Sequence, residues 1–436
     1  MMQRAEVAVD EDGVRRVLAQ VTLVALLFPY ISPVPMGSDV QPFGFLVAIG
    51  CLGLVFMMQG RIHALDVGDL TLLGAGYVYA FYADWRVQEL DLLFLRKHAV
   101  LLIAFPAYVA AKQLYPHMAR ATVLVVALAY LVITLVQGFA PGVYEMFSSV
   151  LMPRVAARSA DRGLSGPCPE PSFLAFIAIG LPTFYRVLPL RGSERADRVQ
   201  YHVLLAICVM LVVLARSVTG TLLGVAMVGV VWLVSLSSWR KRAVAVGAGL
   251  IAAMLGTAFS QQLLGPRIGT LIKLAATNPA LVLLDASIAS RYVQIVGGTY
   301  IAATHPLGTG RSVGDPEVFD MASRGLGFRE YVPARSMQYI QSNRTDTGNI
   351  AVLSPFGDSL ARMGLLFALM MAAMLAALRA PGAATASRVF LAFGIISSFP
   401  LSFTPFWLLL GMHAGWSRWA HRSPDAPLTS PGAVSR

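Results

Sequence analysis

Long apolar runs separated by short polar stretches make up most of the chain. A helix of roughly 20 apolar residues crosses the hydrocarbon core of a bilayer, which is about 30 Å thick. The runs lie near residues 17–36, 43–59, 68–85, 92–111, 121–140, 172–190, 200–215, 218–236, 243–260, 352–378 and 389–416. Prolines follow Phe399 and Thr404 in the last run, which is therefore either one kinked helix or a tight pair. The pattern predicts an all-α, polytopic transmembrane bundle of about 11–12 spans.

Basic residues between the runs orient this bundle. Most fall in alternate loops, namely Arg15 and Arg16, Arg61, Lys112 and Arg120, Arg191 and Arg195, Arg240 to Arg242, and Arg379 and Arg388. The positive-inside rule makes these loops cytoplasmic, together with the N-terminal segment 1–16 and the tail 417–436. Arg86, Arg96 and Lys97 break the alternation, so the third and fourth spans are the weakest part of the threading.

The composition excludes a water-soluble globule. Only 13% of the residues are charged, against about 25% in soluble domains. The net charge of +11 lies largely in the short basic loops, where it orients a membrane protein instead of recruiting nucleic acid. We also expect no structural disulfide, because Cys51 and Cys208 lie in apolar runs and Cys168 stands alone in a polar loop.

Two segments on the outer side, 141–171 and 261–351, are too long to be simple connectors, so function is sought there. The chain thus divides into nine spans over 17–260, a large periplasmic loop over 261–351 and C-terminal spans over 352–416. Within the large loop, apolar residues recur at helical spacing from Ser287 to Thr304. We expect an amphipathic helix along the membrane face, with Gly297 and Gly298 as its weak point.

The first outer segment carries candidate chemistry at both ends. Arg154, Arg158 and Arg162 are spaced to form one stripe of guanidinium groups on a helix, suited either to an anionic ligand or to lipid phosphates. Glu170 directly precedes Pro171 and the sixth span, so we expect it at the helix cap. Its carboxylate either caps the helix or acts as a general base.

A third candidate is the short outer turn that contains Arg216, Ser217 and Thr219. An arginine this close to hydrocarbon is costly unless it has a partner or access to water, so it is either a functional group or snorkels to the interface. The two hydroxyls, with nearby backbone amides, could help to hold a phosphate.

The large loop contributes Arg291, Arg311 and His305. Each arginine either binds phosphate or is a surface charge, and His305 either ends the helix before Pro306 or acts as a base. In an unbroken helix, Arg291 and His305 stand about 21 Å apart. They can grip one phosphate only if the helix bends at its glycines.

Familiar cofactor and hydrolase motifs are missing from the sequence. It has no Walker loop, no dinucleotide-binding glycine fingerprint, no His-Glu-x-x-His motif and no Gly-x-Ser-x-Gly elbow. The seven histidines are widely scattered, which argues against a metal site. We therefore expect no cofactor, no metal, and a reaction whose energy arrives with the substrate.

Several motifs resemble those of the O-antigen polymerase and O-antigen ligase superfamily of bacterial envelope proteins. They are Glu170-Pro-Ser at the start of a span, Arg216-Ser-x-Thr-Gly between two spans, Ser290-Arg291 on an amphipathic helix, His305-Pro-Leu-Gly-x-Gly310 after it, and Phe356-Gly-Asp-Ser-Leu before the next span. The order of these motifs and the large loop between late spans match the family layout over most of the chain.

One feature departs from the ligase-like members, many of which have a His-Asn pair shortly before that later span. Residues 342–349 hold no histidine here, and none occurs between His305 and His413. The resemblance therefore implies a polysaccharide polymerase more than a ligase.

In such a polymerase of the bacterial inner membrane, a growing glycan moves from undecaprenyl diphosphate to a sugar hydroxyl of another lipid-linked repeat unit at the periplasmic face. Glu170 would activate the hydroxyl, and Arg216, Arg291, Arg311, Arg162 and Arg158 would bind the diphosphate without a metal, supported by Ser217, Thr219 and His305.

The partners implied are the undecaprenyl-diphosphate-linked oligosaccharide, membrane lipids, and the flippase and chain-length or export proteins of the same pathway. An O-antigen ligase-type glycosyltransferase and a lipid-linked oligosaccharide flippase or other transporter remain alternatives. A flippase has less need of a large outer loop bearing arginine and carboxylate together.

Overall fold

The computed structural model describes residues 10–33, 41–59, 65–86, 92–151, 163–235, 277–344, 348–380, 383–397, 399–400 and 403–422, with isolated positions between 238 and 274. These residues fold almost entirely as helices. The one β-bridge among them joins Arg344 to Ile350. The expected all-α class is therefore confirmed.

The helices of the first half are α1 (Glu11–Leu27), α2 (Phe43–Gln59), α3 (Val67–Arg86), α4 (Leu92–Leu114), α5 (Arg120–Phe139), α6 (Pro141–Leu151), α7 (Pro171–Val187), α8 (Glu194–Ala215) and α9 (Val218–Ser235). Those of the second half are α12 (Ala286–Thr304), α13 (Pro316–Leu326), α14 (Phe328–Tyr331), α15 (Ala334–Ser342), α16 (Pro355–Met363), α17 (Leu365–Ala377), α18 (Ala384–Ser397) and α19 (Thr404–Arg422). Short 3₁₀ helices cover Tyr115–His117 and Pro279–Leu284.

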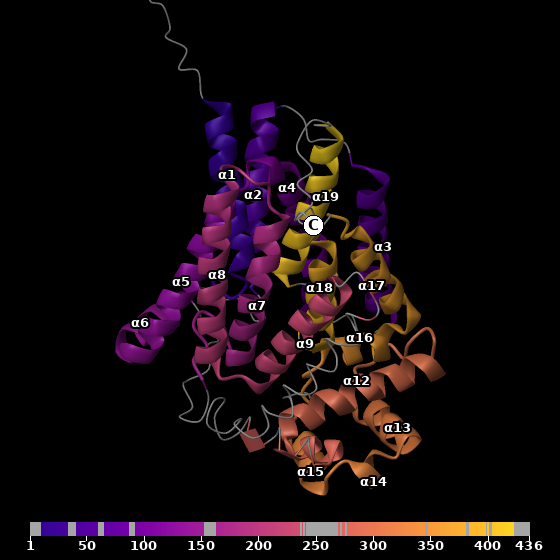
Figure 1. Cartoon of the computed structure of the whole chain (residues 1–436). Coiled ribbons are helices and arrows are strands. Elements are labelled where there is room, and N and C mark those ends of the chain that lie inside the picture. Colours follow the sequence, from indigo (N-terminus) through magenta and orange to yellow (C-terminus); the bar gives the residue numbers. More distant parts are fainter. Residues whose placement is uncertain are drawn as a thin grey trace, which may run out of the picture.

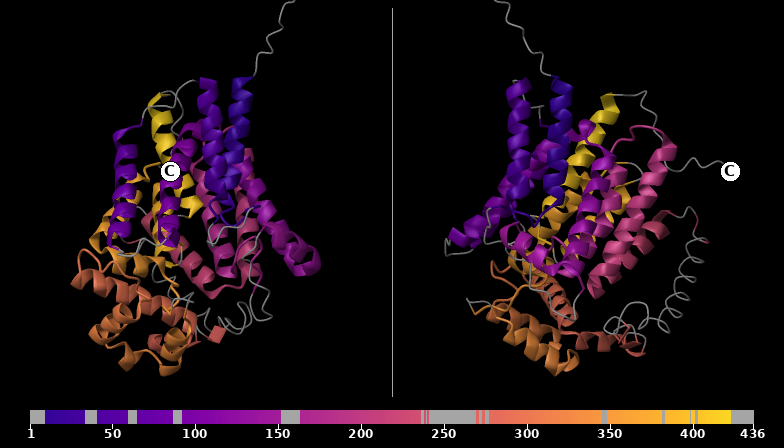
Figure 2. Two further views of the ribbon diagram at one scale, coloured as in Figure 1. Left: turned by 180° about the vertical axis from the view of Figure 1, so that it is seen from behind. Right: turned by 90° about the vertical axis from the view of Figure 1, so that its left-hand side faces the viewer.

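The long apolar helices stand side by side as a bundle, and α12 to α15 lie at one end of it (Figure 1). Helix α12 runs across the direction of the bundle helices, and α6 projects sideways near the same end (Figures 1 and 2). Contacts between helices hold the bundle together, chiefly α4 with α19, α1 with α2, and α7 with α8 and α9. We call α12 to α15 the loop unit.

Two of the helices, α5 and α8, are long and apolar enough to cross a membrane, and five shorter helical segments are also apolar. Both long helices leave large apolar side chains exposed. On α5 these include Val132 and Phe139, the latter 87% exposed, and on α8 they include Val209 and Val213. A soluble monomer rarely exposes so much contiguous apolar surface.

Three of the predicted runs need comment. Helix α1 ends at Leu27, well before residue 36, because Pro29 follows Phe28, and a residue that precedes proline disfavours helical backbone. The last run is a pair of helices, α18 and α19, and not one kinked helix. The run over 243–260 lies outside the described residues.

The prediction of a single span over 352–378 is wrong, because the helix breaks between α16 and α17 at Gly364. This residue has φ 56° and ψ −132°, which no other residue type adopts readily. A β-carbon there would lie 2.1 Å from the carbonyl oxygen of Pro306. That carbonyl accepts a hydrogen bond of 2.8 Å from the amide of Leu365, so the loop after α12 enters the break.

The helix expected over Ser287–Thr304 is confirmed as α12, but its expected weak point is wrong. Helix α12 runs unbroken through Gly297 and Gly298. A β-carbon on Gly298 would lie 2.1 Å from the carbonyl oxygen of Gly357 on α16. The glycine lets the two backbones pack closely, so its lack of a side chain serves the crossing of α12 and α16.

A buried ionic cluster ties α3 to α4 at the opposite end of the bundle. Lys112 donates hydrogen bonds to both carboxylate oxygens of Asp69 at 2.7 Å and to Asp66 at 2.5 Å. The hydroxyl of Tyr108 donates to Asp69 as well. Asp69 is only 1% exposed, so its charge depends on these partners.

Candidate functional site

The loop that leads into α7 is held in a fixed shape by α5. The side-chain oxygen of Gln137 accepts hydrogen bonds of 2.8 Å from the amides of Ser165 and Gly166. Its amide nitrogen donates to the hydroxyl of Ser165 at 3.0 Å. Gly166 has φ +54°, and a β-carbon on it would collide with Thr134. These contacts hold the loop before α7 in a single conformation.

Tyr144 on α6 clamps the same loop from the other side. Its hydroxyl donates a 2.5 Å hydrogen bond to the carbonyl of Gly166. Burial raises the pKa of Tyr144 to about 12, so the hydroxyl stays protonated and remains a donor. Cys168 is fully buried in this loop. Burial raises the pKa of its thiol well above the ordinary value, so it stays neutral and is a poor nucleophile.

Glu170 occupies the N-cap position of α7, as predicted, but its side chain does not cap the helix. Its carboxylate accepts a 3.2 Å hydrogen bond from the hydroxyl of Ser172. Among the residues that the structure describes, no lysine or arginine forms an ion pair with it. The half-buried carboxylate is thus held in place and is left available to a ligand.

Arg216 forms the turn between α8 and α9 in a left-handed conformation, with φ 44° and ψ 34°. Within the described ranges it is the only residue other than glycine with a positive φ. Such backbone costs an L-residue about 1–2 kcal/mol and often marks functional positions. Its side chain is exposed, with no ion pair among the described residues.

Ser217 lies between Arg216 and the first residue of helix α9. Its hydroxyl accepts a 3.0 Å hydrogen bond from the amide of Gly220, which is an N-cap contact. The predicted supporting residue Thr219 lies in the first turn of α9. Ser217 is buried, so its hydroxyl serves the turn.

The ends of α7, α8 and α9 meet at one place, which we call the α7–α9 junction and define by Glu170, Arg216 and Ser217. The amide of Leu164 donates a 3.0 Å hydrogen bond to the carbonyl of Leu214. A β-carbon on Gly220 would lie 2.3 Å from that of Ala175, so α7 and α9 touch there.

The contact between Ala175 and Gly220 limits how far Glu170 and Arg216 can lie from each other along the direction of the helices. Ala175 follows Glu170 by about 7.5 Å of helix rise, and Gly220 lies one helical turn beyond Arg216. The junction lies at the end of the bundle that carries the loop unit (Figure 1).

Arg291 lies in the second turn of α12 and is half-buried. Its guanidinium group donates to the hydroxyl of Ser287 and, at 3.3 Å, to the carbonyl of the same residue. Asp285 caps the helix by accepting from the amides of Ser287 and Ile288. These contacts hold the guanidinium group against the first turn of α12.

His305 and Arg311 follow the other end of α12. His305 is the C-cap, as expected from the proline after it, and its ring lies 3.0 Å from the hydroxyl of Thr304. Arg311 forms an exposed ion pair with Glu317. Because α12 is unbroken, Arg291 stands about 21 Å from His305, and the two cannot grip one phosphate.

The structure thus sorts the predicted site residues into three sets. Glu170, Arg216, Ser217 and Thr219 lie in the first turns or caps of α7, α8 and α9, whose ends approach one another at the α7–α9 junction. Arg291 lies at the start of α12, and His305 and Arg311 lie beyond its end. The predicted stripe of Arg154, Arg158 and Arg162 lies outside the described residues.

Sequence reasoning missed three polar residues that position these groups. Gln137 holds the loop before Glu170. Gln294 on α12 accepts from the amides of Leu353 and Ser354 at 2.8 Å. Asp358 on α16 accepts from the hydroxyl of Ser312 and from the amide of Val313. A polar residue inside an apolar run, as Gln137 is, was the available signal.

The junction combines the chemistry of a carboxylate and a guanidinium group. The carboxylate of Glu170 can accept a proton from a hydroxyl that binds beside it. The guanidinium group of Arg216 can bind two phosphate oxygens at once. Across the residues described, no group of three or more histidine, cysteine, aspartate or glutamate side chains could hold a metal ion.

Comparison with protein-family models found no match, and comparison with curated proteins found none either.

Proposed function

We propose that this chain is a multi-pass inner-membrane polysaccharide polymerase. It would transfer a growing glycan from undecaprenyl diphosphate to a sugar hydroxyl of another lipid-linked repeat unit, at the outer face of the membrane. The observation that carries the proposal is the α7–α9 junction, where a helix end with a carboxylate that does not cap it approaches a turn that holds an arginine in strained backbone. The motif resemblance over Glu170 and Arg216 supports the same function.

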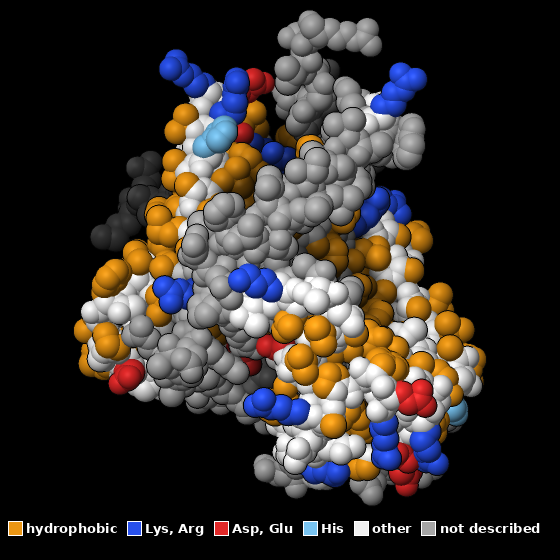
Figure 3. Space-filling model, turned by 60° about the horizontal axis from the view of Figure 1, so that its bottom comes forward, with side chains coloured by type: hydrophobic (Ala, Val, Ile, Leu, Met, Phe, Trp, Pro, Cys, Tyr) orange, Lys and Arg blue, Asp and Glu red, His pale blue; other side chains and the backbone are white. Residues whose placement is uncertain are grey.

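The surface supports the membrane part of this proposal. Apolar side chains lie on the flanks of the bundle, while charged side chains gather on the loop unit and at the opposite tips of the bundle (Figure 3). Exposed valines and methionines on α8, including Val203, Met210 and Val213, face outward along the length of the helix. Contact with lipid chains would remove this apolar surface from water.

The reaction follows from the charges at the junction. Glu170 takes the proton from the acceptor hydroxyl, and the oxygen forms a bond to the anomeric carbon of the donor glycan. The bond between that carbon and the diphosphate oxygen breaks, and the diphosphate leaves with the electron pair. Arg216, with Arg291 of α12 in the bound complex, stabilises the negative charge that develops on the leaving group. The proton then passes from Glu170 to the solvent.

The test is the substitution Glu170→Gln, which keeps an oxygen that can accept from Ser172. If Glu170 takes the proton, elongation slows at least about a hundredfold, within the usual range for the loss of a general base. Single lipid-linked repeat units then accumulate while polymer disappears. Glu145→Gln is the matched control, because Glu145 is exposed on α6 and its side chain has no hydrogen-bond partner among the described residues.

Normal elongation by Glu170→Gln would remove the residue from the mechanism. A deletion strain separates the other functions. Repeat units trapped on the cytoplasmic face would indicate the flippase alternative, and normal polymer left unattached to its final carrier would indicate the ligase alternative. Either result would refute the polymerase proposal.

A further inference from the structure

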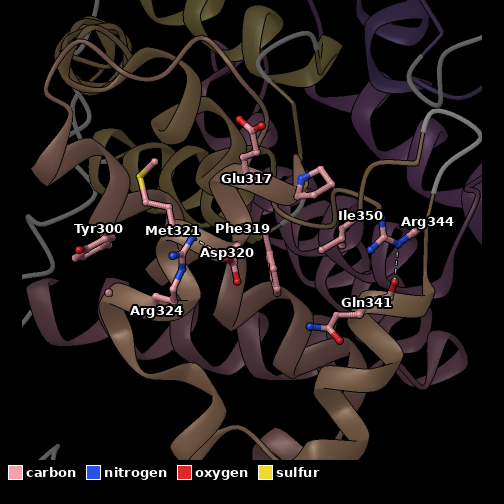
Figure 4. Close-up of a pocket in the computed structure, with 11 residues that line it drawn as sticks. Tyr300, Glu317, Phe319, Asp320, Met321, Arg324, Gln341, Arg344 and Ile350 are labelled. Carbon is pink, nitrogen blue, oxygen red and sulfur yellow. Dashed lines mark hydrogen bonds and ion pairs between the residues drawn. The ribbon is translucent and has the colours of Figure 1, made fainter.

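The loop unit contains an open cleft that includes none of the predicted site residues. Its volume is about 940 Å³, and its walls come from α12, α13, the end of α15 and the bridged pair Arg344 and Ile350. Figure 4 shows Tyr300 and Arg324 at one end and Gln341 and Arg344 at the other. Phe319 and Asp320 of α13 lie between them.

The cleft is shaped to keep an aromatic ring in place. A β-carbon on Gly325 would lie 2.2 Å from the hydroxyl oxygen of Tyr300 and 2.3 Å from its ring. The ring of Tyr300 therefore lies directly against Gly325. At the other end, Arg344 donates hydrogen bonds to the carbonyls of Gln341 and Gly348, at 3.1 and 2.8 Å. Both ends of the cleft are thus fixed before any ligand binds.

The charges of the cleft balance one another. Arg324 forms an ion pair of 2.7 Å with Asp320, one helical turn before it. Arg311 neutralises Glu317 at the rim. Arg344 donates to two carbonyls and forms no ion pair among the described residues, so the cleft offers a single guanidinium group without a carboxylate partner, which makes it a poor site for a diphosphate.

Planar polar groups and an aromatic ring are what a sugar requires. Neighbouring hydroxyls on a sugar ring both donate and accept, and carboxylate, guanidinium and amide groups can bind two of them at once. The C–H face of the ring is apolar and packs on an aromatic side chain such as Tyr300. The volume is near the upper end of the roughly 300–1,000 Å³ found for small-molecule sites, which suits several sugar units in a row.

We propose that this cleft binds the oligosaccharide part of the acceptor repeat unit. The identification of the ligand as the acceptor repeat unit rests on the proposed function, whereas oligosaccharide binding by the cleft does not depend on it. The cleft then acts as a saccharide subsite that holds the acceptor while its terminal hydroxyl reaches the reacting centre.

The experiment uses the full-length protein in nanodiscs and two double variants. Asp320→Asn with Gln341→Ala removes two cleft groups, and Glu330→Gln with Gln338→Ala makes the same changes at exposed residues of α14 and α15 outside the cleft. The probe is the set of soluble oligosaccharides freed by partial acid hydrolysis from the surface polysaccharide of the cells that make the protein. Binding is read from the protein's intrinsic fluorescence. Elongation is measured as the KM for single lipid-linked units.

We expect the wild type and the control variant to bind a fragment equally, and the cleft variant to bind it at least ten times more weakly. The KM of the cleft variant for single units should rise at least tenfold, whereas Arg216→Ala should act mainly on kcat. Fragment binding that is lost with KM unaltered would overturn the acceptor assignment, since the cleft would then hold finished polymer.

Two results would overturn the cleft as a saccharide site altogether. One is a wild type that binds no fragment, and the other is equal binding by the cleft and control variants. The proposed function fails separately, through normal elongation by Glu170→Gln. If the wild-type protein does not elongate chains but the cleft variant still binds the fragment more weakly than the control variant, the saccharide site is supported and the polymerase function is refuted.

Discussion

Replacing Arg216 with glycine should separate the stability of the α7–α9 junction from its function. Arg216 holds φ 44° at the end of α8, where glycine would carry no steric cost. Its side chain is exposed, with no ion pair among the described residues. The arginine is therefore unfavourable for the fold, and a function in substrate binding would explain its presence.

Two opposing effects set the change in the free energy of unfolding that Arg216→Gly should cause. Left-handed backbone costs a residue with a β-carbon about 1–2 kcal/mol, and glycine removes that cost. Glycine also gives the unfolded chain more freedom, which costs about 0.5–1 kcal/mol. Arg216→Gly should therefore raise the free energy of unfolding by up to about 1.5 kcal/mol. Arg216→Ala keeps the strain, so its stability should stay within about 0.5 kcal/mol of the wild type.

Thermal unfolding can be followed with a thiol-reactive dye, because Cys51, Cys168 and Cys208 are all buried and free. At one scan rate, Arg216→Gly should unfold about 2 °C above Arg216→Ala. Both variants should lose roughly a hundredfold in elongation rate, the usual cost of removing one charge-stabilising donor. A glycine variant less stable than the alanine variant would refute the strain argument, and full activity of either variant would remove the guanidinium group from the reaction.

Three further predictions concern packing, charge and topology. Gly298→Ala should destabilise the α12–α16 crossing by about 1–3 kcal/mol relative to Gly297→Ala. The new methyl would lie 2.1 Å from a carbonyl oxygen in Gly298→Ala, but 3.3 Å from a methyl group in Gly297→Ala. Equal rates of amide hydrogen exchange at residues 353–354 in the two variants would contradict this prediction. Lys112→Met leaves a buried carboxylate unpaired and should cost about 3–5 kcal/mol, which a normal unfolding temperature would rule out. In a cysteine-free background, an impermeant thiol reagent should label Gln338→Cys and not Ser193→Cys in intact cells, and the reverse pattern would overturn the threading.

Helix bounds could be predicted from the sequence where they depend only on residues nearby in the chain. Apolar runs and local stop signals place α2, α5 and α7 within three residues of the observed bounds, because helix formation depends on neighbours three or four positions away. The break at Gly364 could not be predicted in this way. It depends on the carbonyl of Pro306, which reaches the glycine only in the folded protein.

The same distinction applies to the candidate site. Proline at the first helical position placed Glu170 at the N-cap, as the sequence predicted. Whether its carboxylate caps the helix depends on the path of the preceding loop, which Gln137 and Tyr144 fix through contacts distant in sequence. The left-handed backbone of Arg216 likewise carries no sequence signal, because arginine is an unusual choice at such a position.

The unbroken helix α12 relates the two proposals to each other. Arg291 lies near its start and Tyr300 near its end, about 13.5 Å apart along a straight helix. A lipid-linked repeat unit has a compact diphosphate at one end and sugars extending from it, so its two ends need different binding chemistry. Arg291, held against Ser287, offers a guanidinium group at the first position, and the charge-balanced cleft beside Tyr300 offers planar polar groups at the second. Because α12 does not bend at its glycines, the distance between the two is fixed, and the helix would hold diphosphate and saccharide groups apart.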